Sequence, residues 1–182
     1  MSTVEPIRDI DKINEIKTYL RSQNQRDFIM FLLGINSGLR ISDILRLKVS
    51  DVKDKDSIIL IEKKTGKEKR FLLNDSLKSE LSGYIAFKDD PEYLFSRHRT
   101  GIKALDRTTA YRIINSAARA VGIKDRIGTH TLRKTFGFHF YKKTKDVALL
   151  QHLFNHSAPS VTLRYIGINQ DIIDTAMKDF SL

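Results

Sequence analysis

The stretch FIMFLLGI, at residues 28–35, is almost uniformly apolar. A helix without a polar face has to be enclosed by other elements, so we expect residues 25–35 to form a buried helix. Gly38 follows shortly afterwards and is expected to close it. The chain of 182 residues suits a single domain, and a hydrophobic fraction of 41% is sufficient for a core around this helix.

The segments on either side predict further helices and one pair of strands. Residues 57–61 (SIILI) and 70–73 are typical of strands, and the KTGK turn between them predicts a β-hairpin. Ser42 is the expected N-cap of a short helix over DILRL. Other helices are expected over 11–22, over 75–87, over 106–121 closed by Gly122, from Thr129 as N-cap to about Lys142, from Asp146 as N-cap to Phe154, from Pro159 through Tyr165, and over 169–180 with Ile172, Ile173, Ala176 and Met177 on one side. The fold class is therefore mainly α with a small antiparallel β-sheet insertion, in one domain over residues 1–182.

The net charge of +10 is concentrated in one part of the chain. Residues 95–145 contain 13 Lys and Arg but only Asp106 and Asp125 as acids, whereas the remainder has a net charge of −1. Such an asymmetry indicates a polyanionic partner, most commonly nucleic acid, although a solvated basic face is the simpler alternative.

The composition also excludes several kinds of site and of cellular location. There are no cysteines, which excludes disulfides and cysteine-ligated metals, and no cofactor or metal site is visible. No apolar run approaches the roughly 20 residues that span a membrane, and the first 25 residues lack a signal-peptide pattern. We expect an intracellular, cytoplasmic protein.

Several polar residues stand where a helical core does not require them. Arg40, in SGLRISDIL, has the simple alternative of an ion pair with Asp43. His130 and Arg133, in THTLRKTF, are spaced i, i+3 in the first turn of a helix, where a phosphate is favoured. The remaining candidates are a lysine of the hairpin turn, His156, and Tyr165 nine residues after it, and each of these taken singly has an ordinary structural explanation.

Taken in order, GLR, a lysine in a β-turn, HxxR, NHS and a tyrosine nine residues later resemble the catalytic domain of the tyrosine recombinases, the phage integrase family. The resemblance covers residues 26–180. It implies the catalytic set Arg40, Lys64, His130, Arg133, His156 and Tyr165, with Lys63 and Lys67 close enough to compete with Lys64. One departure is Asn155, where the family more often has glycine, but asparagine also tolerates the left-handed conformation.

The resemblance implies a reaction without cofactors. Tyr165 would attack a DNA phosphodiester and form a 3′-phosphotyrosyl intermediate, releasing a 5′-hydroxyl. Arg40 and Arg133 would hold the non-bridging oxygens, and Lys64 would protonate the leaving oxygen. His130 would act as the base near the phenol, and His156 would hydrogen-bond the phosphate.

Two other functions remain open, namely a type IB topoisomerase and a non-catalytic DNA-binding regulator on the same fold. The expected partners are double-stranded DNA and further copies of the chain on DNA, with a mostly monomeric free protein and no membrane. Family members usually carry a separate N-terminal domain that completes a clamp around DNA. We expect the chain to be a catalytic domain without that N-terminal domain, either excised or a short recombinase that acts alone.

Overall fold

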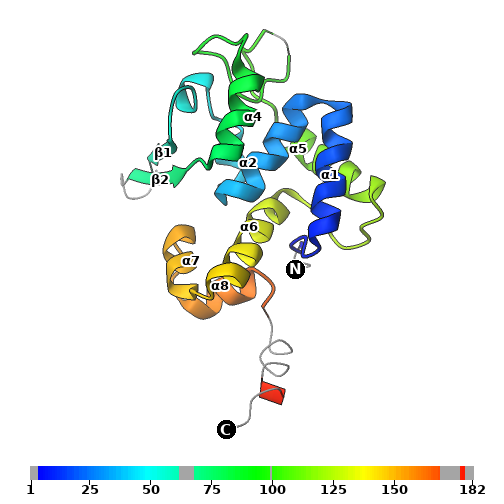
Figure 1. Cartoon of the computed structure of the whole chain (residues 1–182), viewed down its shortest axis with the longest axis vertical. Coiled ribbons are helices and arrows are strands. Elements are labelled where there is room, and N and C mark those ends of the chain that lie inside the picture. The colour runs from blue at the N-terminus through cyan, green and yellow to red at the C-terminus, as the bar shows by residue number, and fades with distance from the viewer. Residues whose placement is uncertain (1–3, 62–67, 99, 169–176, 179–182) are drawn as a thin grey trace.

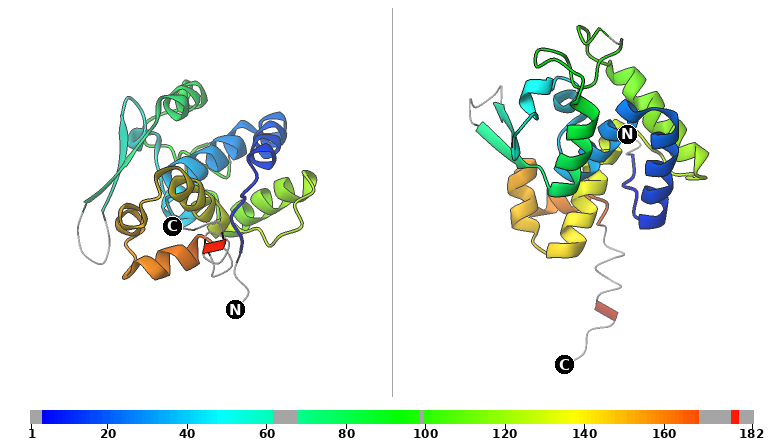
Figure 2. Two further views of the ribbon diagram at one scale, coloured as in Figure 1. Left: turned by 60° about the horizontal axis from the view of Figure 1, so that its bottom comes forward. Right: turned by 45° about the horizontal axis from the view of Figure 1, so that its top comes forward.

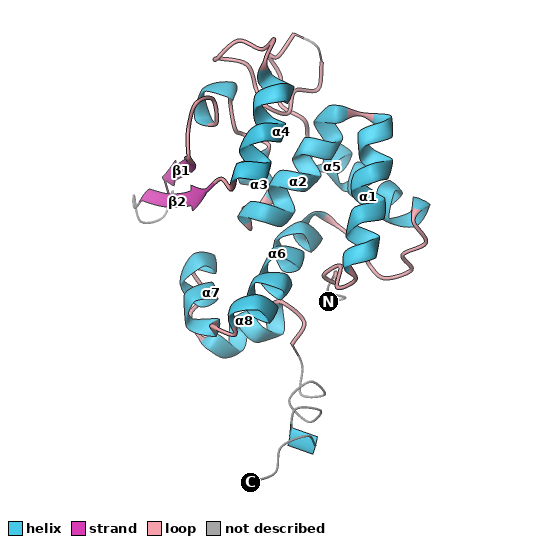
Figure 3. Ribbon diagram, viewed as in Figure 1, coloured by secondary structure: helices cyan, strands magenta, loops and turns pink. Residues whose placement is uncertain are grey.

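The computed structural model describes residues 4–61, 68–98, 100–168 and 177–178 (Figure 1). Its elements run in the order α1 (Ile10–Gln23), α2 (Gln25–Ser37), α3 (Ile41–Ile44), the 3₁₀ turn η1 (Val49–Asp51), β1 (Ser57–Ile61), β2 (Glu68–Leu72), α4 (Asp75–Ile85), α5 (Arg107–Ala120), α6 (Thr129–Thr144), α7 (Val147–Phe154) and α8 (Pro159–Tyr165). The mainly helical class with one small antiparallel sheet is confirmed (Figure 3).

Helix α2 is the centre of the main core, as its apolar sequence predicts. Phe28, Ile29, Met30, Phe31 and Leu33 are each at most 2% exposed, and α1, α4 and α6 pack around them. Gly38 ends the helix in the left-handed conformation, with φ of 66°. The expected buried helix and its glycine cap are confirmed.

The hairpin is also confirmed, and it projects from the helical body (Figure 2). β1 and β2 pair antiparallel, with Ser57 opposite Leu72 and Ile61 opposite Glu68. The second strand covers 68–72 rather than the expected 70–73. The connecting turn, with Lys63, Lys64 and Lys67, lies outside the described residues, as does most of the helix expected over 169–180.

Helix α6 extends from the main core to a second, smaller cluster formed with α7 and α8. Leu150, Phe154 and Ile166 are the buried residues of this cluster, and the ring of Tyr165 packs against it. Gly137 allows this packing, because a Cβ there would come within 2.7 Å of Ile166 and 2.8 Å of Phe154. The close approach of α8 to α6 fixes where the end of α8 lies.

Two expected helix caps were wrong. Ser42 lies inside α3, because the backbone carbonyl of Arg40 already accepts hydrogen bonds from the amides of Asp43 and Ile44, so the helix begins at Ile41. Gly128, not Thr129, is the N-cap of α6, and the hydroxyl of Thr131 accepts from the Gly128 amide at 3.1 Å. The expected cap at Asp146 and the helix start at Pro159 are confirmed.

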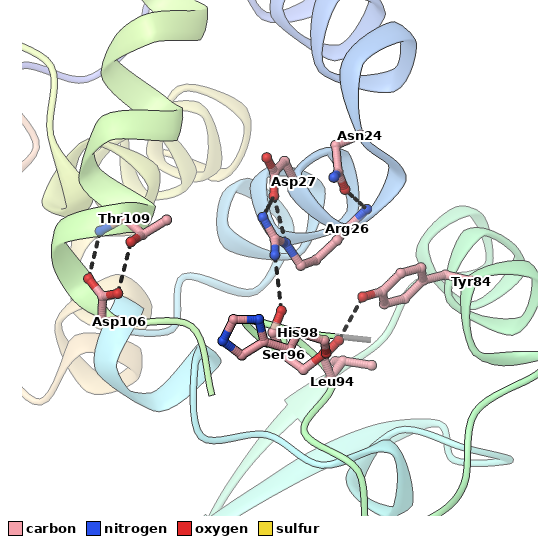
Figure 4. Close-up of polar contacts among 9 residues, drawn as sticks. All are labelled: Asn24, Arg26, Asp27, Tyr84, Leu94, Ser96, His98, Asp106 and Thr109. Atoms are coloured by element: carbon pink, nitrogen blue, oxygen red, sulfur yellow. Dashed lines mark hydrogen bonds and ion pairs between the residues drawn. The ribbon is translucent and has the colours of Figure 1, made fainter. Parts of the chain in front are cut away.

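Polar contacts hold the loop that leads into α5 (Figure 4). Arg26 pairs with Asp27 and donates to the carbonyl of Ser96 at 3.0 Å. Tyr84 donates to the carbonyl of Leu94 at 2.8 Å. Asp106 then caps α5 by accepting from the amide and the hydroxyl of Thr109. The contacts of Arg26 and Tyr84 fix the loop, and α5 itself packs against α1 and α6.

Candidate active site

The side chain of Arg133 joins the two cores. It is 4% exposed and donates hydrogen bonds to the carbonyl of Gly38, at the end of α2, and to that of Phe154, at the end of α7, the latter at 3.0 Å. Its guanidinium also lies 4.0 Å from the centre of the Phe154 ring. Arg40 follows Gly38 by two residues and His156 follows Phe154 by two, so the contacts of Arg133 bring both segments to one place.

Arg133 keeps its charge at this buried position. Burial is the main cause that lowers its pKa to about 10, and the neighbouring charge of Arg40 lowers it further, whereas Tyr165 and Asp43 act in the opposite direction. A pKa of about 10 leaves the guanidinium protonated at neutral pH. The group is therefore a fixed, poorly solvated positive charge, which attracts an anion more strongly than an exposed arginine does.

His156 is oriented by its neighbours. Asn155 before it has φ of 54°, so asparagine adopts the left-handed conformation as expected. The Nδ1 atom of His156 lies 3.0 Å from the Thr162 hydroxyl, and its ring lies 5.1 Å from that of Tyr165. Burial lowers the pKa of His156, and the charges of Arg133 and Arg40 lower it further, so the ring is neutral at pH 7.

Tyr165 is the last residue of α8, and its ring is half-buried. The ring packs edge-on against Phe154 at 5.6 Å and against His156. Burial raises the pKa of the phenol, while the charges of Arg133 and Arg40 and a hydrogen bond from Arg133 lower it. Tyr165 can therefore serve both as a packed residue and as a reactive one, because the packed ring directs its oxygen towards the arginines.

His130 is exposed in the first turn of α6. Its pKa is lowered by partial burial first, and then by the charges of Arg107, Arg133, Lys134 and Arg40. A lowered pKa keeps the imidazole neutral, and so able to accept a proton, at neutral pH. Arg40, at the N-cap position of α3, is exposed to solvent.

The structure brings together five of the six residues expected at the site: Arg40, His130, Arg133, His156 and Tyr165. Lys64 lies outside the described residues. The arrangement offers permanent positive charges, neutral imidazoles and a phenol at one surface. Such a set can hold an anionic ester and attack it.

A hollow of 560 Å³ lies between α1, α2 and α4, lined in part by Phe28 and Glu80, and it contains none of the five residues. Within the described part of the chain there is no group of three or more His, Asp or Glu residues placed to hold a metal ion. The same residues include no helix long and apolar enough to cross a membrane.

Sequence reasoning missed two residues of the site, Thr162 and Lys134. Thr162 is fully buried beneath His156, and Lys134 is 6% exposed with its Nζ 5.3 Å from the centre of the Tyr165 ring. The sequence around Lys134 did contain a weak indication that this lysine is enclosed. Apolar residues occur on several sides of α6 (Leu132, Phe136, Phe138, Phe140), so a lysine between them had to be partly enclosed.

The chain is similar to known proteins over nearly its whole length. The model of the phage integrase family matches residues 7–171. The chain is 52% identical over 180 residues to the probable integrase/recombinase YoeC of Bacillus subtilis (strain 168), covering 99% of the chain and 98% of that protein. It is 34% identical over 160 residues to a tyrosine recombinase of Pseudothermotoga lettingae, covering 86% of the chain and 54% of that protein.

Solved structures share the fold. The crystal structure of the XerH site-specific recombinase bound to palindromic difH substrate, a post-cleavage complex, superposes with a TM-score of 0.74 over 98% of the chain at 18% identity. The chain spans 54% of that protein, which is again about half.

Proposed function

The chain belongs to the phage integrase family, and we propose that it cleaves and rejoins double-stranded DNA with Tyr165 as nucleophile. The family and fold expected from the sequence are confirmed, and the enzyme class that goes with them is the tyrosine site-specific recombinases. The observation that supports the proposal is the Tyr165 ring packed 5.1 Å from that of His156, with Arg133 and Arg40 close enough to lower the pKa of its phenol.

The reaction exchanges one phosphoester bond for another, because the phosphoryl group passes from the 5′-oxygen of DNA to the oxygen of Tyr165. The phenol oxygen of Tyr165 attacks the phosphorus, a bond forms between them, and the bond from phosphorus to the 5′-oxygen breaks. The 3′-phosphotyrosyl intermediate conserves the energy of the ester, so no nucleotide cofactor is consumed. A 5′-hydroxyl of a second strand reverses the step and releases Tyr165.

Each remaining residue has a part that suits its environment. Arg40 and Arg133 hold the non-bridging oxygens, on which charge builds in the transition state. His130, kept neutral by its lowered pKa, accepts the phenolic proton, and His156 donates a hydrogen bond to the phosphate. Lys64 protonates the departing 5′-oxygen.

The partner we propose is duplex DNA, bound by more than one copy of the chain. The basic stretch over 95–145 includes α5 and α6, and the charge of Arg107 at the start of α5 reaches His130. XerH is bound to a palindromic substrate. A palindrome presents two equivalent half-sites, which suits self-association on DNA by a chain that is mostly monomeric when free.

Formation of a covalent adduct tests the proposal. The protein is incubated with a supercoiled plasmid carrying the DNA that flanks its coding region, and adduct is measured on denaturing gels. We expect adduct with the wild type and with Tyr141→Phe, a half-buried tyrosine of α6, and none with Tyr165→Phe. Adduct formation by Tyr165→Phe contradicts the assignment.

The same assay separates the two other functions. Relaxation of any plasmid without sequence preference is the result for a type IB topoisomerase. Binding of DNA with no adduct under any condition is the result for a non-catalytic regulator. Adduct that depends on the flanking sequence supports recombination.

A further inference from the structure

We propose that Lys134 is a positioning residue for the nucleophile, and that its enclosed ammonium holds the Tyr165 ring and favours the ionised phenol. This inference rests on the proposed function, because it assigns a partner to the tyrosine of that reaction. The observation behind it is the position of the Lys134 Nζ, 5.3 Å from the centre of the Tyr165 ring, in a side chain that is only 6% exposed.

A lysine in this setting is unusual. Lysine is almost never fully buried in proteins unless its charge is compensated, and an aromatic face is one of the groups that attracts an ammonium. The attraction grows when water is excluded, as it is here. Lys134 directly follows Arg133 on α6, so the two cations approach Tyr165 from different directions, Arg133 at the oxygen and Lys134 at the ring.

The N-terminal segment lies along α6 next to this lysine. The amide of Ile7 donates to the hydroxyl of Thr135 at 2.9 Å, and the ring of His139 lies 2.9 Å from the carbonyl of Ile7. These contacts fasten the segment to the part of α6 that directly follows Lys134. Arg8, paired with Glu5 at 3.0 Å, donates to the carbonyl of Gly167, two residues beyond the nucleophile.

The surroundings of Lys134 have opposing effects on the pKa of its ammonium group. Burial lowers the pKa of Lys134, the charge of Glu5 raises it, and that of Arg8 lowers it. The charged and titratable groups facing the lysine–tyrosine pair come from α6, from the turn after α2, from the loop before α8 and from the N-terminal segment; they are His130, Arg133, Arg40, His156, Glu5 and Arg8. Among the acidic groups, Glu5 acts on Lys134 and Asp43 acts on Arg133.

The physical consequence concerns the phenol. A positive charge over the ring stabilises the phenolate relative to the phenol, so Lys134 lowers the proton affinity of the nucleophile. Fixing the ring also reduces the orientations that the oxygen samples before attack. A lysine that only fills space would do neither.

The test replaces Tyr165 by 3,5-difluorotyrosine, whose phenol ionises near neutral pH, and follows its ¹⁹F resonance against pH in the free protein. We expect Lys134→Met to move the midpoint up by about one pH unit, on the scale of a desolvated cation–π contact. Lys134→Arg should restore most of the shift. The matched control is Lys143→Met, an exposed lysine of the same helix, which should leave the midpoint unchanged.

Circular dichroism confirms that each variant is folded, and Lys134→Gln replaces the methionine variant if that one fails to fold. An unchanged midpoint in a folded protein without the Lys134 charge overturns the inference. Adduct formation is measured on the unfluorinated variants, and we expect Lys134→Met to slow it about tenfold. If the midpoint shifts but the wild type forms no adduct, the proposed function is wrong and the role of Lys134 in the ionisation of the phenol is supported. If the wild type forms adduct but the midpoint does not shift, the proposed function is supported and the inference about Lys134 is wrong.

Discussion

At the scale of single residues, Arg133 has a structural task that its neighbour in the site, Arg40, does not share. Two of the N–H groups of Arg133 satisfy the buried carbonyls of Gly38 and Phe154, and the rest of the guanidinium remains for an anion. The side chain of Arg40 is exposed. Substitution of the two arginines should therefore have the same effect on chemistry and different effects on stability.

We expect Arg40→Ala and Arg133→Ala each to slow adduct formation by roughly 10²-fold, the scale for losing one preorganised donor. Arg133→Ala should also reduce the free energy of unfolding by about 2–4 kcal/mol, because it leaves two buried carbonyls without donors. Arg40→Ala should change stability by less than about 0.5 kcal/mol. Thermal melting and single-turnover kinetics check both statements, and equal melting temperatures for the two variants would show that Arg133 has no structural role.

The pH dependence of cleavage is expected to depend on a single residue, His130. His130 has a pKa below its ordinary value of 6.5, so it stays neutral, and active as a base, as the pH falls to 6.5 and somewhat below. We expect the acid limb of the rate profile to have its midpoint below pH 6.5, and the His130→Asn variant to lose that limb along with most of its rate. A midpoint above pH 6.5 would contradict the lowered pKa, and a limb retained in the variant would assign the proton to another group.

Local pairs of residues could be predicted from the sequence, and contacts between distant segments could not. The i, i+3 spacing of His130 and Arg133 placed them together because a helix repeats every 3.6 residues. The hydrogen bonds from Arg133 to Gly38 and Phe154 span 95 and 21 residues, and no local pattern encodes them. Lys134 was missed for the same reason, since its partner Tyr165 belongs to another helix.

At the scale of elements, the turn between α7 and α8 sets the position of His156. Asn155 ends α7 in the left-handed conformation, and asparagine was expected there because its short polar side chain tolerates it. The errors at Ser42 and Thr129 show the limit of such reasoning. Neither helix is capped by a hydroxyl residue, because Arg40 precedes α3 and Gly128 precedes α6, and where each helix begins depends on how the preceding loop is held.

We expect Asn155→Gly to keep adduct formation within about threefold of the wild type, since glycine adopts φ of 54° without strain. Asn155→Val should lower the free energy of unfolding by about 1–2 kcal/mol, because a β-branched residue is disfavoured in this conformation. It should slow the chemistry as well, by displacing His156. Melting temperatures and single-turnover rates of the two variants provide the comparison, and equal behaviour would mean that the turn does not position the histidine.

The hairpin is the second element on which the site depends. Its strands are described and its turn is not, so the assignment of Lys64 as the acid stays a prediction. Lys64→Ala should be slow on ordinary DNA and largely rescued when the bridging 5′-oxygen is replaced by sulfur, because a thiolate leaves without a proton. Lys67→Ala is the matched control on the same turn. Failure of the rescue, or equal rescue of a slow Lys67→Ala variant, would move the role to another residue.

At the scale of the whole molecule, the uneven charge determines how the protein meets DNA. Residues 95–145 carry the excess of basic residues, whereas the rest of the chain has a net charge of −1. Binding through phosphates releases counterions, so the logarithm of the binding constant falls linearly with the logarithm of the salt concentration, with a slope of about 0.9 for each phosphate contacted. We therefore expect weak, steeply salt-dependent binding that is similar for unrelated duplexes.

Substitution of one exposed arginine of α5, Arg112, tests this salt dependence quantitatively. Arg112→Ala should reduce the slope by about one and weaken binding to every duplex alike, because a phosphate contact carries no sequence information. Lys55→Ala removes a cation that is also exposed but lies outside the basic stretch, and it should leave the slope unchanged. Fluorescence anisotropy with two duplexes of unrelated sequence, at four salt concentrations, measures both. Equal losses from the two substitutions would mean that net charge alone attracts DNA, and that α5 is not part of the surface that contacts it.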